Sequence, residues 1–224
     1  MATAKDFGKQ LLAQAPQLAP GASAMVLRKA LDLAIDGAGR IPGAKATAAA
    51  ALQKQGAVEP AVNMIVKQHV AMAGAQGFVT NLGGLATLAV SIPANVTGVA
   101  IVQCRMVAAI AHLRGYDIED PRVRSAILMC LLGENLAQEA VQRQELPSSA
   151  LAIATAPVHD PALDSTIAEK VLGTLMGQVG GKRVSLLAGK KIPGVGGAIG
   201  AGTDGWATWG TGSFARKQFV TRRR

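Results

Sequence analysis

Apolar residues recur three and four positions apart along most of the chain, the spacing that places them on one face of an α-helix. The first such stretch follows Ser23, whose side chain can cap a helix, and ends at Gly37. A second helix is expected over the alanine-rich residues 45–55, and a third begins at Glu59-Pro60, where proline fits a first turn. No alternation of apolar and polar residues typical of strands persists anywhere.

The 37 residues from Gln68 to Cys104 carry no formal charge. A membrane-spanning helix needs about 20 predominantly apolar residues, so this stretch is long enough to span. It also contains Asn81, Asn95 and Gln103, and amide side chains in lipid must find hydrogen-bond partners. We therefore favour two buried or interfacial helices joined near Ser91-Ile92-Pro93, with a true span as the alternative.

The second half of the chain continues the helical pattern. Asp120-Pro121 predicts a helix start, because aspartate caps and proline occupies the first turn. Residues 147–161 indicate a linker, and the next helix is expected from Asp164 or Ser165 to a break at Gly180-Gly181. Eight glycines lie between residues 192 and 212, and small residues four apart form a ridge that allows close helix packing.

These patterns predict an all-α fold, a compact bundle of roughly 7–9 helices with a buried, uncharged central helix pair and a Gly-rich C-terminal helix. We expect that last helix, near Ile199, to pack against the uncharged helices between Gly83 and Arg105. Residues 1–20 would form an N-terminal arm and residues 21–215 a single helical domain with an internal linker at about 145–162. Residues 216–224 would form a basic C-terminal tail.

Positive charge is concentrated near the end of the chain. Of the 23 Lys and Arg residues, nine fall in residues 182–224, where Asp204 is the only acid; residues 1–181 hold the other 14 against 13 acids. The basic end suits an anionic partner, although a solvated tail is the alternative. Two tryptophans precede this end and resemble a membrane-interface anchor, unless they cap the core. The candidate interface residues are Trp206, Trp209, Arg216, Lys217, Arg222, Arg223 and Arg224.

Motifs for catalysis or cofactor binding are absent from the sequence, and we assign no catalytic residue, metal site or cofactor. His69, His112 and His159 lack metal-ligand spacing, and no Gly-x-Ser-x-Gly element occurs. Cys104 and Cys130 lie within apolar helical patterns, which indicates buried, reduced thiols. Because the first residues lack the apolar core of a secretory signal, we expect a cytoplasmic protein, peripheral to or embedded at the inner face of the membrane.

Arg105 interrupts an apolar helix. Burying an unpaired guanidinium is expensive, so it needs a partner, either Asp204 or Glu134. A structural ion pair and recognition of an anionic headgroup or carboxylate both remain open. The candidate binding residues are Asn81, Asn95, Gln103, Arg105 and Asp204.

Several motifs in order resemble the EcsC family. They are Gly83-Gly84-Leu85, Ile92-Pro93-Ala94, Val102-Gln103-Cys104-Arg105-Met106, Gly115-Tyr116-Asp117 and Asp120-Pro121-Arg122-Val123-Arg124. The end, Ile192-Pro193-Gly194 and the helix with Asp204, is also similar, so the resemblance covers most of residues 30–223. Asn95 is a departure, because many relatives carry an acid there. The resemblance implies a membrane-linked role and names no reaction.

The expected function is that of a non-enzymatic, membrane-associated helical protein that binds lipid or assists a membrane transport or secretion complex. The partners would be a membrane or anionic lipid, or a membrane protein complex. The alternative is a soluble helical adaptor whose basic tail binds an acidic protein or nucleic acid. Aromatic residues make up only 3% of the chain, which disfavours the stacking used to bind single-stranded nucleic acid. An enzyme acting on a lipid-like substrate through Arg105, Asp204 and Glu134 is the third option; the oligomeric state is open.

Overall fold

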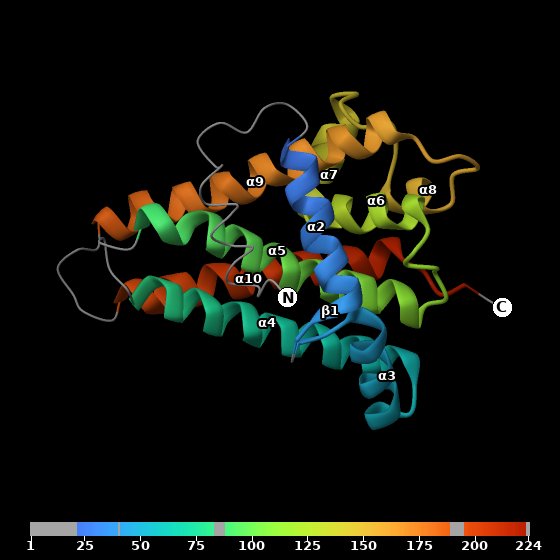
Figure 1. Ribbon diagram of the computed structural model, residues 1–224, viewed down its shortest axis with the longest axis horizontal. Helices are drawn as coiled ribbons and strands as arrows, with labels where there is room; N and C mark the ends of the chain where they lie inside the picture. The colour runs from blue at the N-terminus through green and yellow to red at the C-terminus, as the bar shows by residue number, and fades with distance from the viewer. Residues whose placement is uncertain (1–21, 40, 83–87, 189–194, 223–224) are drawn as a thin grey trace.

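The computed structural model describes residues 22–39, 41–82, 88–188 and 195–222, with the side chains of residues 22–24, 38, 76–96 and 178–201 outside the description. Within this part of the chain, nine helices and a short two-stranded ribbon form an all-α bundle (Figure 1). The helices are α2 Ala22–Asp36, α3 Ala44–Gln55, α4 Val58–Leu82, α5 Leu88–Leu113, α6 Pro121–Cys130, α7 Gly133–Gln142, α8 Ala150–Ala154, α9 Pro161–Ala188 and α10 Val195–Gln218.

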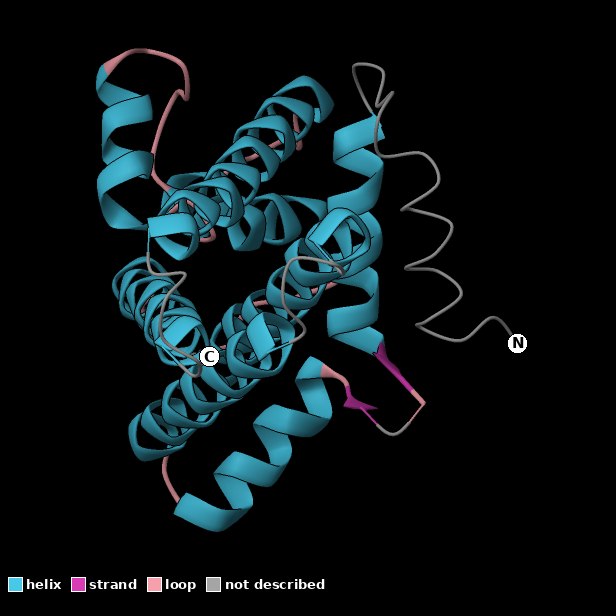
Figure 2. Cartoon of the chain, turned by 90° about the vertical axis from the view of Figure 1, so that its left-hand side faces the viewer, coloured by secondary structure: helices cyan, strands magenta, loops and turns pink. Residues whose placement is uncertain are grey.

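The long helices α4, α5, α9 and α10 run together toward one end of the molecule, where four of their termini lie (Figures 1 and 2). The shorter helices gather around the other half. Helix α10 packs most extensively against α4 and also contacts α5, while α2 crosses α5 and α9. Helix α5 is therefore surrounded by neighbours.

The core is centred on α5, whose residues 102–111 are all buried. Apart from Gln103 and Arg105, these ten residues are apolar, as expected for a helix segment covered by neighbours on every face. Helix α4 differs, because Lys67, Gln68 and Met72 expose one of its faces. None of the helices, taken over the described residues, is both long and apolar enough to cross a membrane.

Asp-Pro pairs begin two of the helices. Pro121 is the first residue of α6 and the Asp120 side chain accepts a hydrogen bond from the Arg122 N–H at 2.9 Å, as the sequence predicts. Helix α9 begins in the same way at Pro161, with Asp160 accepting from the Ala162 N–H at 2.9 Å. The expected start at Asp164 or Ser165 is therefore wrong by one turn, because Asp160 supplies the cap.

Two expected helix breaks are also wrong. Helix α5 begins at Leu88 and continues through Ser91-Ile92-Pro93, where a junction was expected. Pro93 is the sixth residue of α5, so it removes one hydrogen bond close to the start of the helix and does not end it. Helix α9 continues through Gly180-Gly181 to Ala188. A helical glycine costs only about 1 kcal/mol relative to alanine, which tertiary packing overrides.

The segments expected as linker and tail contain helical structure. Helix α8 lies within residues 145–162, capped by the Ser149 hydroxyl, which accepts from the Ala152 N–H at 3.3 Å. Arg216 and Lys217 are in the last turn of α10, which ends at Gln218. The chain therefore stays folded well into the basic segment.

Glycines let α10 approach α4 closely. A Cβ added at Gly205 would lie 3.7 Å from Val70 of α4, and one at Gly212 would lie 3.1 Å from Val66 and 3.2 Å from Met106 of α5. Close packing of this helix is thus seen at Gly205 and Gly212, and its main neighbour is α4 rather than the expected residues 83–105, although α10 also contacts α5. Ile199 and Gly200 lie outside the described side chains.

Gly212→Leu is expected to lower the free energy of unfolding by about 2 kcal/mol, because the new side chain meets Val66 and Met106 with no free space. Gly210→Ala is the matched control, since nothing lies within 4 Å of its added Cβ. That change should stabilise by about 0.5–1 kcal/mol through lower backbone freedom in the unfolded chain. Urea unfolding of both variants measures the difference; equal stabilities would refute the packing described for Gly212.

Candidate functional site

Two tryptophan side chains project from α10 into solvent. Trp206 is 74% exposed and Trp209 is 50% exposed. Their rings stack on each other with centroids 5.4 Å apart and an interplanar angle of 30°. The alternative that they cap the core is therefore wrong, because these large apolar surfaces face outward.

The tryptophans belong to one stripe of α10, in which Trp206, Trp209 and Lys217 are exposed and Ser213 and Arg216 are half-buried. Ser213, Arg216 and Lys217 follow Trp206 and Trp209 at helical spacing, so all five lie on the same face of the helix. With a rise of 1.5 Å per residue, the stripe extends about 17 Å from Trp206 to Lys217. An aromatic pair at one end and two cations at the other thus share one face.

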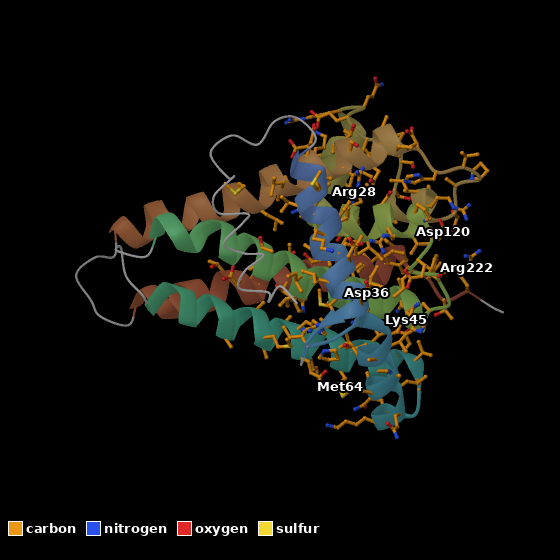
Figure 3. All side chains as sticks on the ribbon, viewed as in Figure 1. Arg28, Asp36, Lys45, Met64, Asp120 and Arg222 are labelled. Carbon is orange, nitrogen blue, oxygen red and sulfur yellow. The ribbon has the colours of Figure 1, made fainter. Side chains whose placement is uncertain are left out.

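Lys217 of the stripe and Arg222 beyond it are both tied to the body of the protein. Lys217 Nζ lies 2.6 Å from Glu134 Oε2 of α7, so Glu134 pairs with Lys217 rather than with Arg105. The Arg222 guanidinium stacks over the Tyr116 ring at 5.2 Å. Arg222 lies at the end of the molecule opposite the four long-helix termini (Figures 1 and 3). Arg223 and Arg224 lie outside the described residues.

Arg105 is 3% exposed and lies on α5. Its Nε donates to His69 Nε2 of α4 at 3.2 Å, and its Nη1 donates to the Pro42 carbonyl oxygen at 3.4 Å. Its Nη2 lies 3.6 Å from the sulfur of Met72. No ion pair among the described residues joins Arg105 to Asp204, so the expected pairing is not observed. Burial lowers the pKa of Arg105, as expected for a cation among neutral groups.

A short turn fixes the position of the Pro42 carbonyl. The ribbon pairs β1 Gly37–Ala38 with β2 Ile41–Pro42, between α2 and α3. Gly37 has φ +85°, and a Cβ at Gly43 would lie 2.2 Å from the Ile35 carbonyl oxygen. Only glycine fits such an approach, so the ribbon closes tightly against the end of α2.

His69 orients Arg105 and is itself oriented by its own helix. Its Nδ1 lies 2.8 Å from the Ile65 carbonyl oxygen. Because the Arg105 Nε–H can only donate, Nε2 must accept, and Nδ1 therefore carries the proton. Burial lowers the pKa of His69 to about 4, and the Arg105 charge acts in the same direction. The imidazole is thus neutral at pH 7.

Gln103, another candidate binding residue, forms a separate buried polar contact. Gln103 Nε2 donates to Thr208 Oγ1 of α10 at 3.3 Å, while its Oε1 is buried without a hydrogen-bond partner. Asp204, one turn before Thr208, is also buried. Gln103 and Arg105 leave α5 in different directions, toward α10 and toward α4. The sequence thus grouped residues that the fold divides, and the side chains of Asn81 and Asn95 lie outside the description.

Two buried polar networks were missed by the sequence analysis. Asp164 of α9 accepts from Ser125 Oγ of α6 and from Arg28 Nε of α2, both at 2.8 Å (Figure 3 labels Arg28). Arg114 bonds both carboxylate oxygens of Glu59, at 2.8 and 2.9 Å. No local sequence motif predicts such contacts, because the partners are far apart in sequence.

The described residues offer little for catalysis or metal binding. No three His, Cys, Asp or Glu side chains gather as a metal site in this part of the chain. Cys104 and Cys130 are buried free thiols, and burial raises the pKa of both. Neither is therefore an activated nucleophile at neutral pH.

Comparison with known protein families matches residues 44–223 to the EcsC protein family. No curated protein and no solved structure matches the chain. Because the family match covers most of its 224 residues, the chain belongs to the EcsC protein family.

Proposed function

We propose that this EcsC-family protein binds membrane surfaces and does so without catalysing a reaction, with α10 as the docking element. The observation that carries the proposal is the stacked pair Trp206 and Trp209, exposed by 74% and 50%. Large aromatic side chains seldom face water in pairs without a partner surface. Indole is favoured at the membrane interface, where its ring meets acyl chains and its N–H meets headgroups.

The rest of the stripe suits an orientation with α10 lying along the membrane surface. Arg216 and Lys217 share the face of the tryptophans, which is how interfacial helices combine apolar anchors with cations for anionic lipid. The Lys217–Glu134 ion pair is exposed, and such pairs contribute at most about 1 kcal/mol. Lys217 can therefore exchange Glu134 for a lipid phosphate at little cost.

The expected affinity is modest. Each buried indole removes about 150–250 Å² from water, but only part of each ring is free to be buried. At about 25 cal/mol per Å², the pair contributes no more than several kcal/mol, and each nearby cation adds about 1 kcal/mol on anionic lipid. These values support reversible attachment that combines a salt-insensitive aromatic part with a salt-sensitive cationic part.

Changing Trp206 and Trp209 together to alanine is expected to reduce flotation with anionic liposomes by at least tenfold, which corresponds to about 1.4 kcal/mol. Both side chains are exposed, so the melting temperature should change little. Val158→Ala is the matched control, because Val158 is equally exposed but lies in the loop before α9. For the wild type, added salt should weaken flotation without abolishing it.

Two outcomes would contradict this function. One is full liposome binding by the double tryptophan variant. The other is a wild type that binds duplex DNA but not anionic liposomes at low salt, with a salt dependence set by the phosphates neutralised. The second outcome would favour the adaptor alternative.

A further inference from the structure

The positive charge of Arg105 is not compensated within the described structure. Two arginines are buried there, Arg105 and Arg114. Arg114 forms an ion pair with Glu59 at 2.8 Å, whereas the contacts of Arg105 are an imidazole nitrogen, a carbonyl oxygen and a thioether sulfur. Asp36, at the end of α2 beside the ribbon (Figure 3), forms no ion pair with Arg105 either.

A buried cation without an anion destabilises the folded protein, because neutral partners do not replace the lost hydration. The weakest contact is the one at Nη2, since sulfur is a poor acceptor. Nη1 and Nη2 each carry two N–H groups, and each has one contact. One N–H on each terminal nitrogen is thus left for another acceptor, and adjacent guanidinium N–H groups match the oxygens of an oxyanion.

The groups around the guanidinium differ in kind. On one side lies the backbone of the ribbon, which packs closely at Gly43 against the Ile35 carbonyl. On the other side, Met72 covers Nη2 and is 42% exposed. Methionine is unbranched and adapts its shape easily. Movement of this side chain is the opening that the site proposed below requires.

We propose that Arg105 is the recognition group of an anion site that opens beneath Met72, between the β1–β2 ribbon and α4, and takes a phosphate group. The phosphate comes either from a free ion or from a lipid headgroup. His69 is a positioning residue, which holds the guanidinium through Nε and leaves the terminal nitrogens to the ligand. The site does not include Trp206 or Trp209, so this proposal can be tested independently of membrane docking.

The first test is thermal unfolding with inorganic phosphate, against chloride at equal ionic strength. At ten times the dissociation constant, phosphate should raise the wild-type melting temperature by about 4 °C. Arg105→Gln should abolish this rise, while Arg143→Gln, which removes an exposed cation of a surface ion pair, should retain it. Met72→Ala should lower the dissociation constant severalfold, because the cover is removed.

A second arm identifies the source of the phosphate. Wild type and Arg105→Gln are floated with phosphatidylcholine vesicles with and without phosphatidic acid. The site is assigned to a lipid headgroup if the wild type prefers vesicles with phosphatidic acid, Arg105→Gln loses this preference, and the wild type does not respond to free phosphate. The double tryptophan variant should keep its response to free phosphate, which separates this site from the docking surface.

The proposal is overturned if the wild type responds to neither ligand, or if a response persists in Arg105→Gln. If Arg105→Gln does not fold, Met72→Ala serves as the test variant. A Met72→Ala affinity equal to that of the wild type for both free phosphate and phosphatidic acid would rule the site out.

Discussion

Arg114→Met is expected to lower the free energy of unfolding by about 4 kcal/mol, because two carbonyl oxygens each lose a hydrogen bond to a charged donor, which contributes about 1.5–3 kcal/mol. Arg114 Nη1 donates to the Arg216 and Phe219 carbonyl oxygens at 2.5 and 2.7 Å. Its Nη2 holds Glu59 at the start of α4. The variant leaves the carbonyls at the end of α10 without a cap and separates α10 from α4 and α5.

Urea unfolding measures the loss, which should also appear as a fall in melting temperature of about 10 °C. Arg143→Met is the control, since Arg143 forms an exposed pair with Glu139 four residues away, and such pairs contribute less than about 1 kcal/mol. Equal stability of the two variants would show that Arg114 does not hold the end of α10.

Lowering the pH from 7 to 4 is expected to remove about 3 kcal/mol of unfolding free energy through His69 alone. The pKa of this residue falls to about 4 in the folded protein from an ordinary value of 6.5. Between these two values the unfolded chain binds a proton that the folded protein does not. Stability therefore falls as the pH drops from about 6.5 to 4, and this contribution stops changing below the folded pKa.

His69→Gln provides the reference, because glutamine can accept from Arg105 and donate to Ile65 but does not titrate. The free energy of unfolding of both proteins is measured with urea from pH 7.5 to pH 4. The difference between the two proteins cancels the contributions of the other titrating groups. The wild type should lose about 3 kcal/mol more than His69→Gln over this range. Parallel stability curves would show that His69 is not held neutral in the fold.

The sequence predicted those parts of the fold that depend on neighbouring residues. The start of α6 at Asp120-Pro121 and the end of α3 at Gly56, which has φ +71°, follow from local backbone chemistry. The length of α9 did not, because a glycine pair weakens a helix without stopping it and packing decides the outcome. The all-α class was therefore predictable, whereas the two expected breaks were wrong and the start of α9 at Asp160-Pro161 was missed although its signal is local.

The candidate site could be predicted only in part. The exposure of Trp206 and Trp209 was undecided because small residues occur on several faces of α10, so periodicity does not show which face is buried. Arg105 was rightly placed inside, but its expected acidic partner was wrong. That expectation assumed that every buried charge is neutralised by an opposite charge in the chain, and Arg105 instead contacts neutral atoms of α4 and β2.

Membrane docking through α10 is most directly tested by tryptophan fluorescence, because the two tryptophans of the chain are Trp206 and Trp209. Anionic vesicles should shift the emission to shorter wavelength as the rings leave water. Lipids brominated near the headgroup end of the acyl chain should quench the emission more than lipids brominated near the bilayer centre, since indole prefers the interface. An emission spectrum that neither shifts nor is quenched at saturating vesicle concentration would contradict the account.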